Sequence, residues 1–130
     1  MKIGLGRMVL LVKEFEEALK FYQDNLACVK LYDTINEIGK RFLHIGFHKN
    51  NNVGLWFLKA ETEEQLSRVG NQTGGTPAFV IYTDGLDKIY ERLKANKVKI
   101  VKEPVESEEF SFLHFLDLYG NEIVLVQLND

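Results

Sequence analysis

The tripeptide FLH occurs twice in the chain, at residues 42 to 44 and 112 to 114, and each copy ends in a histidine. An imidazole titrates near neutral pH, so His44 and His114 are the candidate catalytic acids or bases of this sequence. Each could instead be a hydrogen-bonded packing residue of a strand. Arg7 lies in an apolar strand-like run, where a guanidinium needs either an internal acid such as Glu122 or the anionic group of a ligand.

The two histidines lie in segments whose patterns predict strands and helices in a repeated order. Helical spacing of apolar residues over Glu14–Leu26 and Leu86–Leu93 predicts one helix in each half. The predicted strands are Gly6–Val12, Lys30–Asn36, Arg41–Phe47 and Val53–Lys59 in the first half, and Pro77–Thr83, Lys99–Val105, Phe110–Leu116 and Glu122–Gln127 in the second. A turn is predicted at Lys49–Asn52 and a short polar helix at Glu63–Val69. Each half therefore has the predicted order βαβββ.

The two halves are also in register with each other. Val12 precedes the first helix as Thr83 precedes the second, 71 residues later, and Val29 and Ile100 follow the helices with the same spacing. The FLH triplets lie 70 residues apart, each in the third strand of its half, which indicates a duplicated unit. The sequence predicts an α+β fold of two tandem βαβββ modules, residues 1–60 and 77–130, joined by a linker at 61–76. A chain of 130 residues that is 45% hydrophobic suits one packed domain spanning 1–130.

Composition excludes several classes of partner. The net charge of −3 is spread over interspersed acidic and basic residues, so no basic block is present to neutralise a row of phosphates, and we expect no nucleic-acid partner. The apolar runs are shorter than a bilayer span, and no signal-peptide pattern precedes the first strand, so we expect a cytoplasmic protein without a membrane partner. The single cysteine, Cys28, follows an apolar helix end, and a buried structural role is predicted for it.

Three stretches resemble the vicinal oxygen chelate superfamily, which includes glyoxalase I, bleomycin-resistance proteins, fosfomycin-modifying enzymes and extradiol dioxygenases. They are VKEFEEALKFYQDNL at 12–26, YTDGLDKIYERLKAN at 82–96 and FLDLYGNEIVL at 115–125. The resemblance implies that the strands of each half curl as a mixed sheet around a pocket, with the helices outside, and that the protein is a homodimer. Two details depart from the family pattern: Ala27 replaces a glycine after the first helix, and Leu118-Tyr119 replaces Pro-Asp in the last turn.

The resemblance also implies four positions at which metal-dependent members hold a divalent ion. In this chain these positions are Arg7, Trp56, Ala78 and Val124. Guanidinium, indole, methyl and isopropyl groups cannot replace the imidazoles and carboxylates that such an ion needs, so we expect no metal and no other cofactor. The alternative, a site for Zn, Ni, Mn or Fe built on the two histidines, would require a third ligand.

Strand alternation, combined with the inward position that the resemblance implies for Val124, predicts which side chains share the pocket. Leu43 and Ile45 should pack on a helix, which leaves Phe42 and His44 facing the pocket. The predicted lining from the remaining strands is Arg7, Val9, Trp56, Ala78, Val80, Tyr82, Phe112, His114, Glu122, Val124 and Val126. Such a lining suits a flat or aromatic ligand that carries an acidic group.

The sequence therefore predicts a metal-free protein of the bleomycin-resistance type that binds a small organic molecule. The alternative is a glyoxalase-type lyase or isomerase, or a dioxygenase-like enzyme, which depends on a metal or uses His44 and His114 as acid and base. Trp56 could be a packing residue, and Phe42 and Phe112 could fill a closed core without a pocket. The residues do not decide between binding and catalysis.

Overall fold

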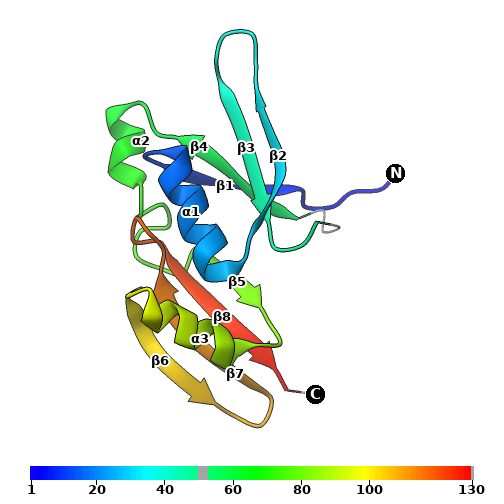
Figure 1. Cartoon of the computed structure of the whole chain (residues 1–130), viewed down its shortest axis with the longest axis vertical. Helices are drawn as coiled ribbons and strands as arrows, with labels where there is room; N and C mark the ends of the chain where they lie inside the picture. Colours follow the sequence, from blue (N-terminus) through cyan, green and yellow to red (C-terminus); the bar gives the residue numbers. More distant parts are fainter. Residues whose placement is uncertain (50–52, 130) are drawn as a thin grey trace. The chain divides into compact units, whose positions relative to one another are not determined.

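A computed structural model describes residues 1–49 and 53–129 (Figure 1). The chain divides into two compact units, Met1–Leu66 and Ser67–Asp130. The first contains β1 (Arg7–Val12), α1 (Phe15–Leu26), β2 (Val29–Ile35), β3 (Arg41–Gly46), β4 (Gly54–Lys59) and most of α2 (Glu63–Arg68). The second contains β5 (Phe79–Tyr82), α3 (Leu86–Ala95), β6 (Ile100–Glu106), β7 (Phe110–Leu116) and β8 (Glu122–Leu128). The predicted turn at Lys49–Asn52 lies almost entirely outside the described residues.

The two units have the same sheet topology. The strand order is β1-β4-β3-β2 in the first sheet and β5-β8-β7-β6 in the second. In each sheet the first and last strands of the βαβββ module pair in parallel, and the other pairs are antiparallel. Both units also contain register shifts in the strand that follows the helix. This shared topology confirms the α+β fold class and the duplication that the FLH triplets indicate.

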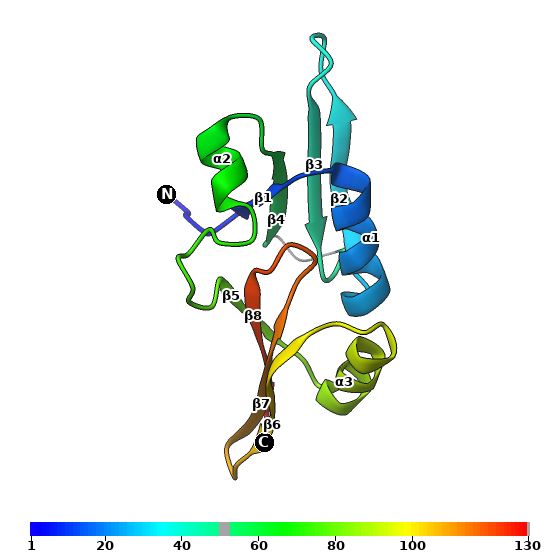
Figure 2. The same ribbon diagram turned by 90° about the vertical axis from the view of Figure 1, so that its left-hand side faces the viewer.

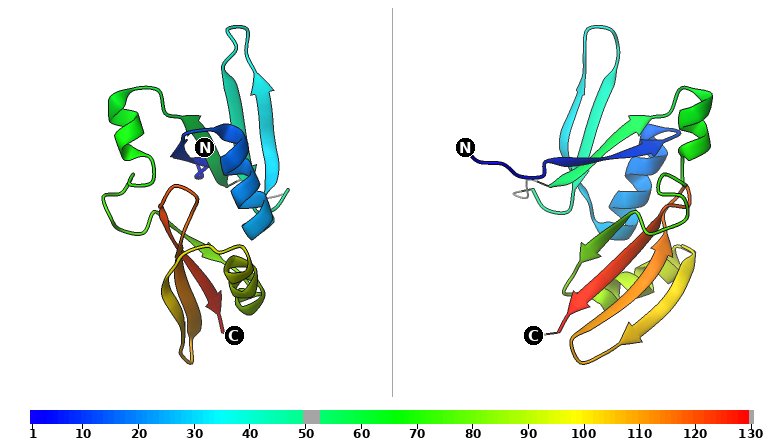
Figure 3. Two further views of the ribbon diagram at one scale, coloured as in Figure 1. Left: turned by 60° about the vertical axis from the view of Figure 1, so that its left-hand side comes forward. Right: turned by 180° about the vertical axis from the view of Figure 1, so that it is seen from behind.

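One face of each sheet packs against the helix of its module. Leu43 and Ile45 on β3 are fully buried, and the Tyr22 ring of α1 lies 5.5 Å from that of Phe57 on β4. In the second unit Leu113, Phe115, Ile123 and Leu125 are fully buried, and Leu93 of α3 is equally buried. Figure 3 shows α3 along one face of this sheet. The buried residues are the set that alternation predicts, so the other side chains of β3 and β7 lie on the opposite face.

The backbone conformation at the end of α1 explains why the family pattern has a glycine where this chain has Ala27. Ala27 has a left-handed conformation with φ 56°, and its N–H donates to the carbonyl of Gln23 at 3.1 Å. This helix cap favours glycine because a Cβ is strained at positive φ. Cys28 follows and is buried, and its burial raises the pKa of the thiol to about 12, which keeps it protonated and unreactive.

The short helix α2 begins with a reciprocal cap. The hydroxyl of Thr62 accepts from the N–H of Gln65, and the Gln65 side-chain carbonyl accepts from the N–H groups of Thr62 and Glu61. This capping box fixes the helix close to the predicted polar helix at Glu63–Val69. No helix in the described part of the chain has the length and hydropathy to cross a bilayer.

The turn between β7 and β8 is organised by one buried carboxylate. Asp117 Oδ1 accepts from the backbone N–H groups of Tyr119, Gly120 and Asn121 at 2.9 to 3.1 Å, and its Oδ2 accepts from the Asn121 amide at 3.0 Å. Gly120 has φ 106°, a conformation that strains any residue with a Cβ. Asp117, Gly120 and Asn121 therefore retain the turn although Leu118-Tyr119 departs from the family pattern.

Replacing Asp117 with alanine is expected to destabilise the protein by at least about 2 kcal/mol, because four donors of the turn, of which the two on Asn121 are buried, lose their acceptor together. Urea denaturation measures the change in the free energy of unfolding. The control is Asp24→Ala, which removes only an exposed ion pair with Lys20 and should cost less than about 0.5 kcal/mol. Equal costs for the two variants would contradict this account of the turn.

Candidate functional site

The face of the first sheet opposite α1 carries a cluster of rings. His44 is the register partner of Trp56 on β4 and of Tyr32 on β2. Its ring centroid lies 5.6 Å from that of Trp56 and 5.4 Å from that of Tyr32, and Phe42 lies 6.2 Å from Trp56. Phe42, His44 and Trp56 are half-buried, whereas Tyr32 is exposed. We call these four residues the aromatic cluster.

Arg7 on β1 fixes the protonation of His44. Its Nε–H donates to His44 Nδ1 at 3.0 Å, and one of its terminal N–H groups donates to the carbonyl of Gly6. Because Nδ1 is an acceptor, the neutral ring carries its proton on Nε2. Burial, and then the charge of Arg7, lower the pKa of His44 below its ordinary value. His44 is therefore a neutral imidazole that presents an N–H.

Two donors of the aromatic cluster are buried and unpaired. Within residues 1–49 and 53–129, neither His44 Nε2 nor Trp56 Nε1 has a hydrogen-bond partner. A buried N–H without an acceptor costs about 1–3 kcal/mol, and an unpaired polar group in a native fold calls for an explanation. Both groups are donors on neighbouring rings, so the group that would satisfy them is an acceptor.

The corresponding face of the second sheet has different chemistry. His114 occupies the position on β7 that His44 has on β3, and its register partner on β8 is Val124. Its Nδ1 lies 2.7 Å from Glu122 Oε2, and both side chains are half-buried. The rings of Phe110, Phe112 and His114 follow one another along β7 at 5.7 Å between centroids.

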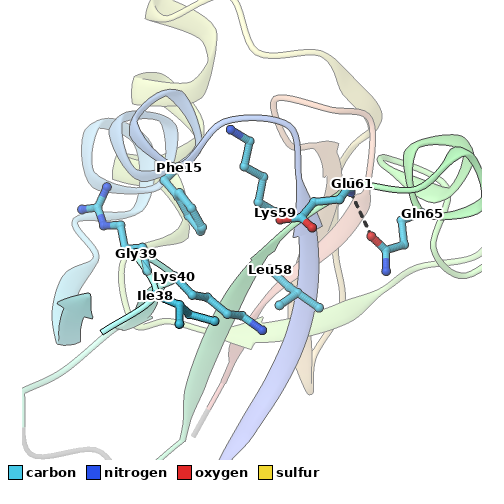
Figure 4. Close-up of a pocket in the computed structure, with 9 residues that line it drawn as sticks. Phe15, Ile38, Gly39, Lys40, Leu58, Lys59, Glu61 and Gln65 are labelled. Carbon is cyan, nitrogen blue, oxygen red and sulfur yellow. Dashed lines mark hydrogen bonds between the residues drawn. The ribbon is translucent and has the colours of Figure 1, made fainter. Parts of the chain in front are cut away.

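A pocket of about 560 Å³ lies in the first unit, where the turn between β2 and β3 faces the end of β4 (Figure 4). Its apolar lining comes from Phe15, Ile38 and Leu58. Its polar and backbone lining comes from Gly39, Lys40, Arg41, Lys59, Glu61 and Gln65. The sequence did not predict this pocket.

Comparisons with known proteins identify the superfamily of this chain. The sequence profile described as the Glyoxalase/Bleomycin resistance protein/Dioxygenase superfamily matches residues 4–125. An uncharacterized protein of Shewanella frigidimarina is 34% identical over 131 residues, which cover 100% of this chain and 97% of that protein. The chain belongs to the glyoxalase/bleomycin resistance protein/dioxygenase superfamily.

Several solved structures have the same fold as this chain. UcmS2 superposes with a TM-score of 0.81 at 23% identity, over 97% of this chain and 98% of that one. TnmS3, an antibiotic binding protein from Streptomyces sp. CB03234, superposes with a TM-score of 0.77 at 22% identity over 99% of both chains. FosX of Listeria monocytogenes, a fosfomycin resistance protein, superposes with a TM-score of 0.71 at 16% identity over 96% of this chain and 93% of that one.

The predicted site residues fall into two groups, one in each unit. Arg7, Val9, Phe42, His44 and Trp56 lie on one face of the first sheet. In the second unit the predicted residues on β7 and β8 are half-buried, whereas Val80 and Tyr82 on β5 are 51% and 70% exposed. This second group is Ala78, Val80, Tyr82, Phe112, His114, Glu122, Val124 and Val126. Sequence analysis missed Tyr32, although its strand is adjacent to that of His44 and a register alignment would have found it.

The superfamily's divalent metal does not fit the residues present. Arg7 and Trp56 in the first unit, and Ala78 and Val124 in the second, supply no imidazole or carboxylate at the four positions that the resemblance implies. Arg7 and Trp56 present N–H groups, which have no lone pair to coordinate a cation. In the described residues, no three His, Cys, Asp or Glu side chains gather closely enough to hold a metal ion.

The depressed pKa of His44 predicts a pH dependence of stability. The unfolded chain binds a proton at His44 below about pH 6.5, whereas the folded chain resists it, so stability is full above that pH and falls as the pH decreases. The loss is at most about 1.4 kcal/mol per pH unit. In urea denaturation at pH 7.5 and 5.5, His44→Gln should reduce this loss.

Exposed His48 provides the control, because His48→Gln leaves the His44 ring and its hydrogen bond from Arg7 in place. The pH dependence of His48→Gln should match that of the wild type. If His44→Gln also matches the wild type, His44 is not held neutral in the folded protein.

Proposed function

We propose that the protein binds a small organic molecule, without a metal, at the aromatic cluster and Arg7. The ligand has a flat ring and an oxygen that accepts hydrogen bonds. In the second unit Tyr82, Phe112 and Glu122 stay predicted ligand-binding residues, and the proposal includes a cytoplasmic homodimer. The observation that carries it is the pair of buried, unpaired N–H groups at His44 Nε2 and Trp56 Nε1.

The energetics favour a ligand over a purely structural role for these rings. A core that only needed aromatic packing would lose nothing by having phenylalanine at both positions, and it would avoid burying two donors without acceptors. An oxygen that reaches one or both N–H groups recovers that cost on binding. The surrounding rings, Tyr32 and Phe42, offer flat surfaces for an aromatic ligand.

The charge of Arg7 favours an electron-rich oxygen. The guanidinium donates to the far nitrogen of His44, so its positive charge polarises the Nε2–H toward the ligand. A carbonyl, phenolic or carboxylate oxygen therefore suits the position better than a neutral ether or an amine. Similarity to a protein described as antibiotic binding and to a fosfomycin resistance protein supports small-molecule binding as the activity.

A second candidate function depends on the second unit. If His114 donates its Nδ1–H to Glu122, its Nε2 is left as a proton acceptor, an arrangement used by general bases. A lyase or isomerase of the glyoxalase type could use such a base without a metal. This candidate requires that the bound molecule is consumed.

A thermal-shift screen with aromatic acids, glycopeptide-type drugs and thiol conjugates tests the binding proposal. At least one class should raise Tm, because a ligand that binds only the folded state stabilises it. Trp56→Phe keeps a ring but removes the N–H, so it should weaken binding of that class by about two- to tenfold, as expected for one hydrogen bond. Titration calorimetry measures the affinity.

The matched control is His48→Phe, which changes an exposed histidine outside the cluster and should leave the affinity unchanged. The binding proposal fails if no compound stabilises the wild type, or if a stabilising compound binds Trp56→Phe as tightly as the wild type.

Chromatography of the incubated ligand separates binding from catalysis. Catalysis predicts that the wild type converts the ligand, and that His114→Gln abolishes conversion while retaining affinity within about threefold, because an imidazole acting as base mainly affects the chemical step. Recovery of unchanged ligand from the wild type would contradict the enzymatic candidate.

A further inference from the structure

The pocket of the first unit lies where two strands separate. The register between β3 and β4 ends at Leu43 and Phe57. Beyond that pair the β2–β3 hairpin extends past the end of β4, as Figure 2 shows. The pocket occupies this divergence, between the hairpin turn that contains Ile38 to Lys40 and the last residues of β4.

The lining of the pocket has an excess of positive charge, and its cations differ in how they are neutralised. Arg41 donates to both oxygens of Asp33 and also to Glu16, so its charge is balanced. The hydrogen bonds from Arg41, and then the nearby Lys30 ammonium, lower the pKa of Asp33 to about 2, so the Asp33–Arg41 pair remains ionised at neutral pH. The Lys59 ammonium lies 3.4 Å from the Glu14 carboxylate, so its charge also has a partner.

Lys40 is the cation of the pocket that is available to a ligand. Its ammonium lies 5.4 Å from the centre of the Phe42 ring, and it has no carboxylate partner in the part of the chain that the structure describes. Figure 4 shows its side chain extending from the hairpin turn toward the strand that carries Leu58. Of the lining residues, only Glu61 is acidic.

The remaining lining suits the body of an organic molecule beside that cation. Phe15, Ile38 and Leu58 supply apolar surface. The carbonyl of the Gln65 side chain is already bound by backbone N–H groups, so its amide N–H groups are the part left to interact. An anionic group held near Lys40 would therefore have apolar contacts on one side and donors on the other.

Phe42 connects this pocket to the aromatic cluster. Its ring lies 6.2 Å from Trp56 and is also the ring over which the Lys40 ammonium lies. Leu58 is two residues beyond Trp56 on β4, so alternation places both on the same face of the sheet. A ligand lying along Phe42 can reach the unpaired N–H groups at one end and Lys40 at the other.

From this continuity we propose that the pocket holds an anionic group of the same ligand, with Lys40 as its charge partner. The ligand class is then an elongated aromatic anion, whose ring bears a carbonyl or phenolic oxygen at the end opposite the charge. This inference rests on the proposed function, since it extends the aromatic-cluster site.

Three probes test the two ends of the site separately. The probe 4-(4-acetylphenyl)butyrate has both features, its butyramide analogue lacks the charge, and 4-phenylbutyrate lacks the acetyl oxygen. The wild type should bind the acetyl acid about two- to fivefold more tightly than the amide, the range expected for a solvent-exposed charge pair. High salt should reduce this preference. NMR titration measures the three affinities.

Variants assign the preference to Lys40. Lys40→Gln should abolish the difference between acid and amide, and Lys40→Arg should retain it. The matched control is Lys94→Gln in the second unit, because Lys94 also lies over an aromatic ring, at 4.5 Å from the centre of Tyr90. That variant should keep the wild-type preference.

The possible failures are distinguishable. Equal binding of acid and amide to the wild type, with the acetyl oxygen still improving affinity, would overturn the Lys40 inference and leave the proposed function intact. A preference for the acid that Lys40→Gln leaves unchanged would do the same. If neither the acetyl group nor Trp56→Phe changes affinity, the proposed function fails, and absence of binding by all three probes contradicts both.

Discussion

The complete burial of Leu43 and Ile45 on β3, and of Leu113 and Phe115 on β7, determines where the other side chains of these strands point. In a β-strand successive side chains face opposite sides, so a core that holds one alternate set places the other set on the far face. A shift of one residue in register would exchange the two sets and expose the apolar core. The positions of His44 and His114 are thus consequences of helix packing on the opposite face of each sheet.

The histidines of the two modules lie at equivalent strand positions but have neighbours of opposite charge. In the first, a cation is the neighbour of the histidine: Arg7 donates to Nδ1, and the ring stays neutral with an outward N–H. In the second, an anion is the neighbour: Glu122 lies against Nδ1 of His114. The duplication therefore preserved the backbone and the position of the imidazole while the adjacent strand changed what that imidazole can do.

Sequence patterns predicted the elements closely because the core is periodic. Strand and helix ends differ by one or two residues, as at β5, which is Phe79–Tyr82 where Pro77–Thr83 was predicted. The face on which Phe42 and Trp56 lie followed from alternation. The partner of Arg7 could not be predicted in this way. The sequence was compatible with an internal acid or a ligand anion, whereas in the structure Arg7 donates to the His44 ring. The Lys40 pocket could not be foreseen, because it depends on how far the hairpin diverges from β4.

The aromatic cluster presents hydrogen-bond donors in a fold for which the family resemblance implies metal ligands. A metal ion needs lone pairs, but the Nδ1 lone pair of His44 is already used by Arg7, and the indole of Trp56 offers only a donor. Trp56 therefore presents an N–H group at one of the positions where the resemblance implies a metal ligand, and His44 presents another on the adjacent strand. Reversing the polarity of a site in this way requires no change of backbone, because the core residues that orient the strands are on the other face. The ligand group proposed for this site is accordingly an electron-rich oxygen and not a cation.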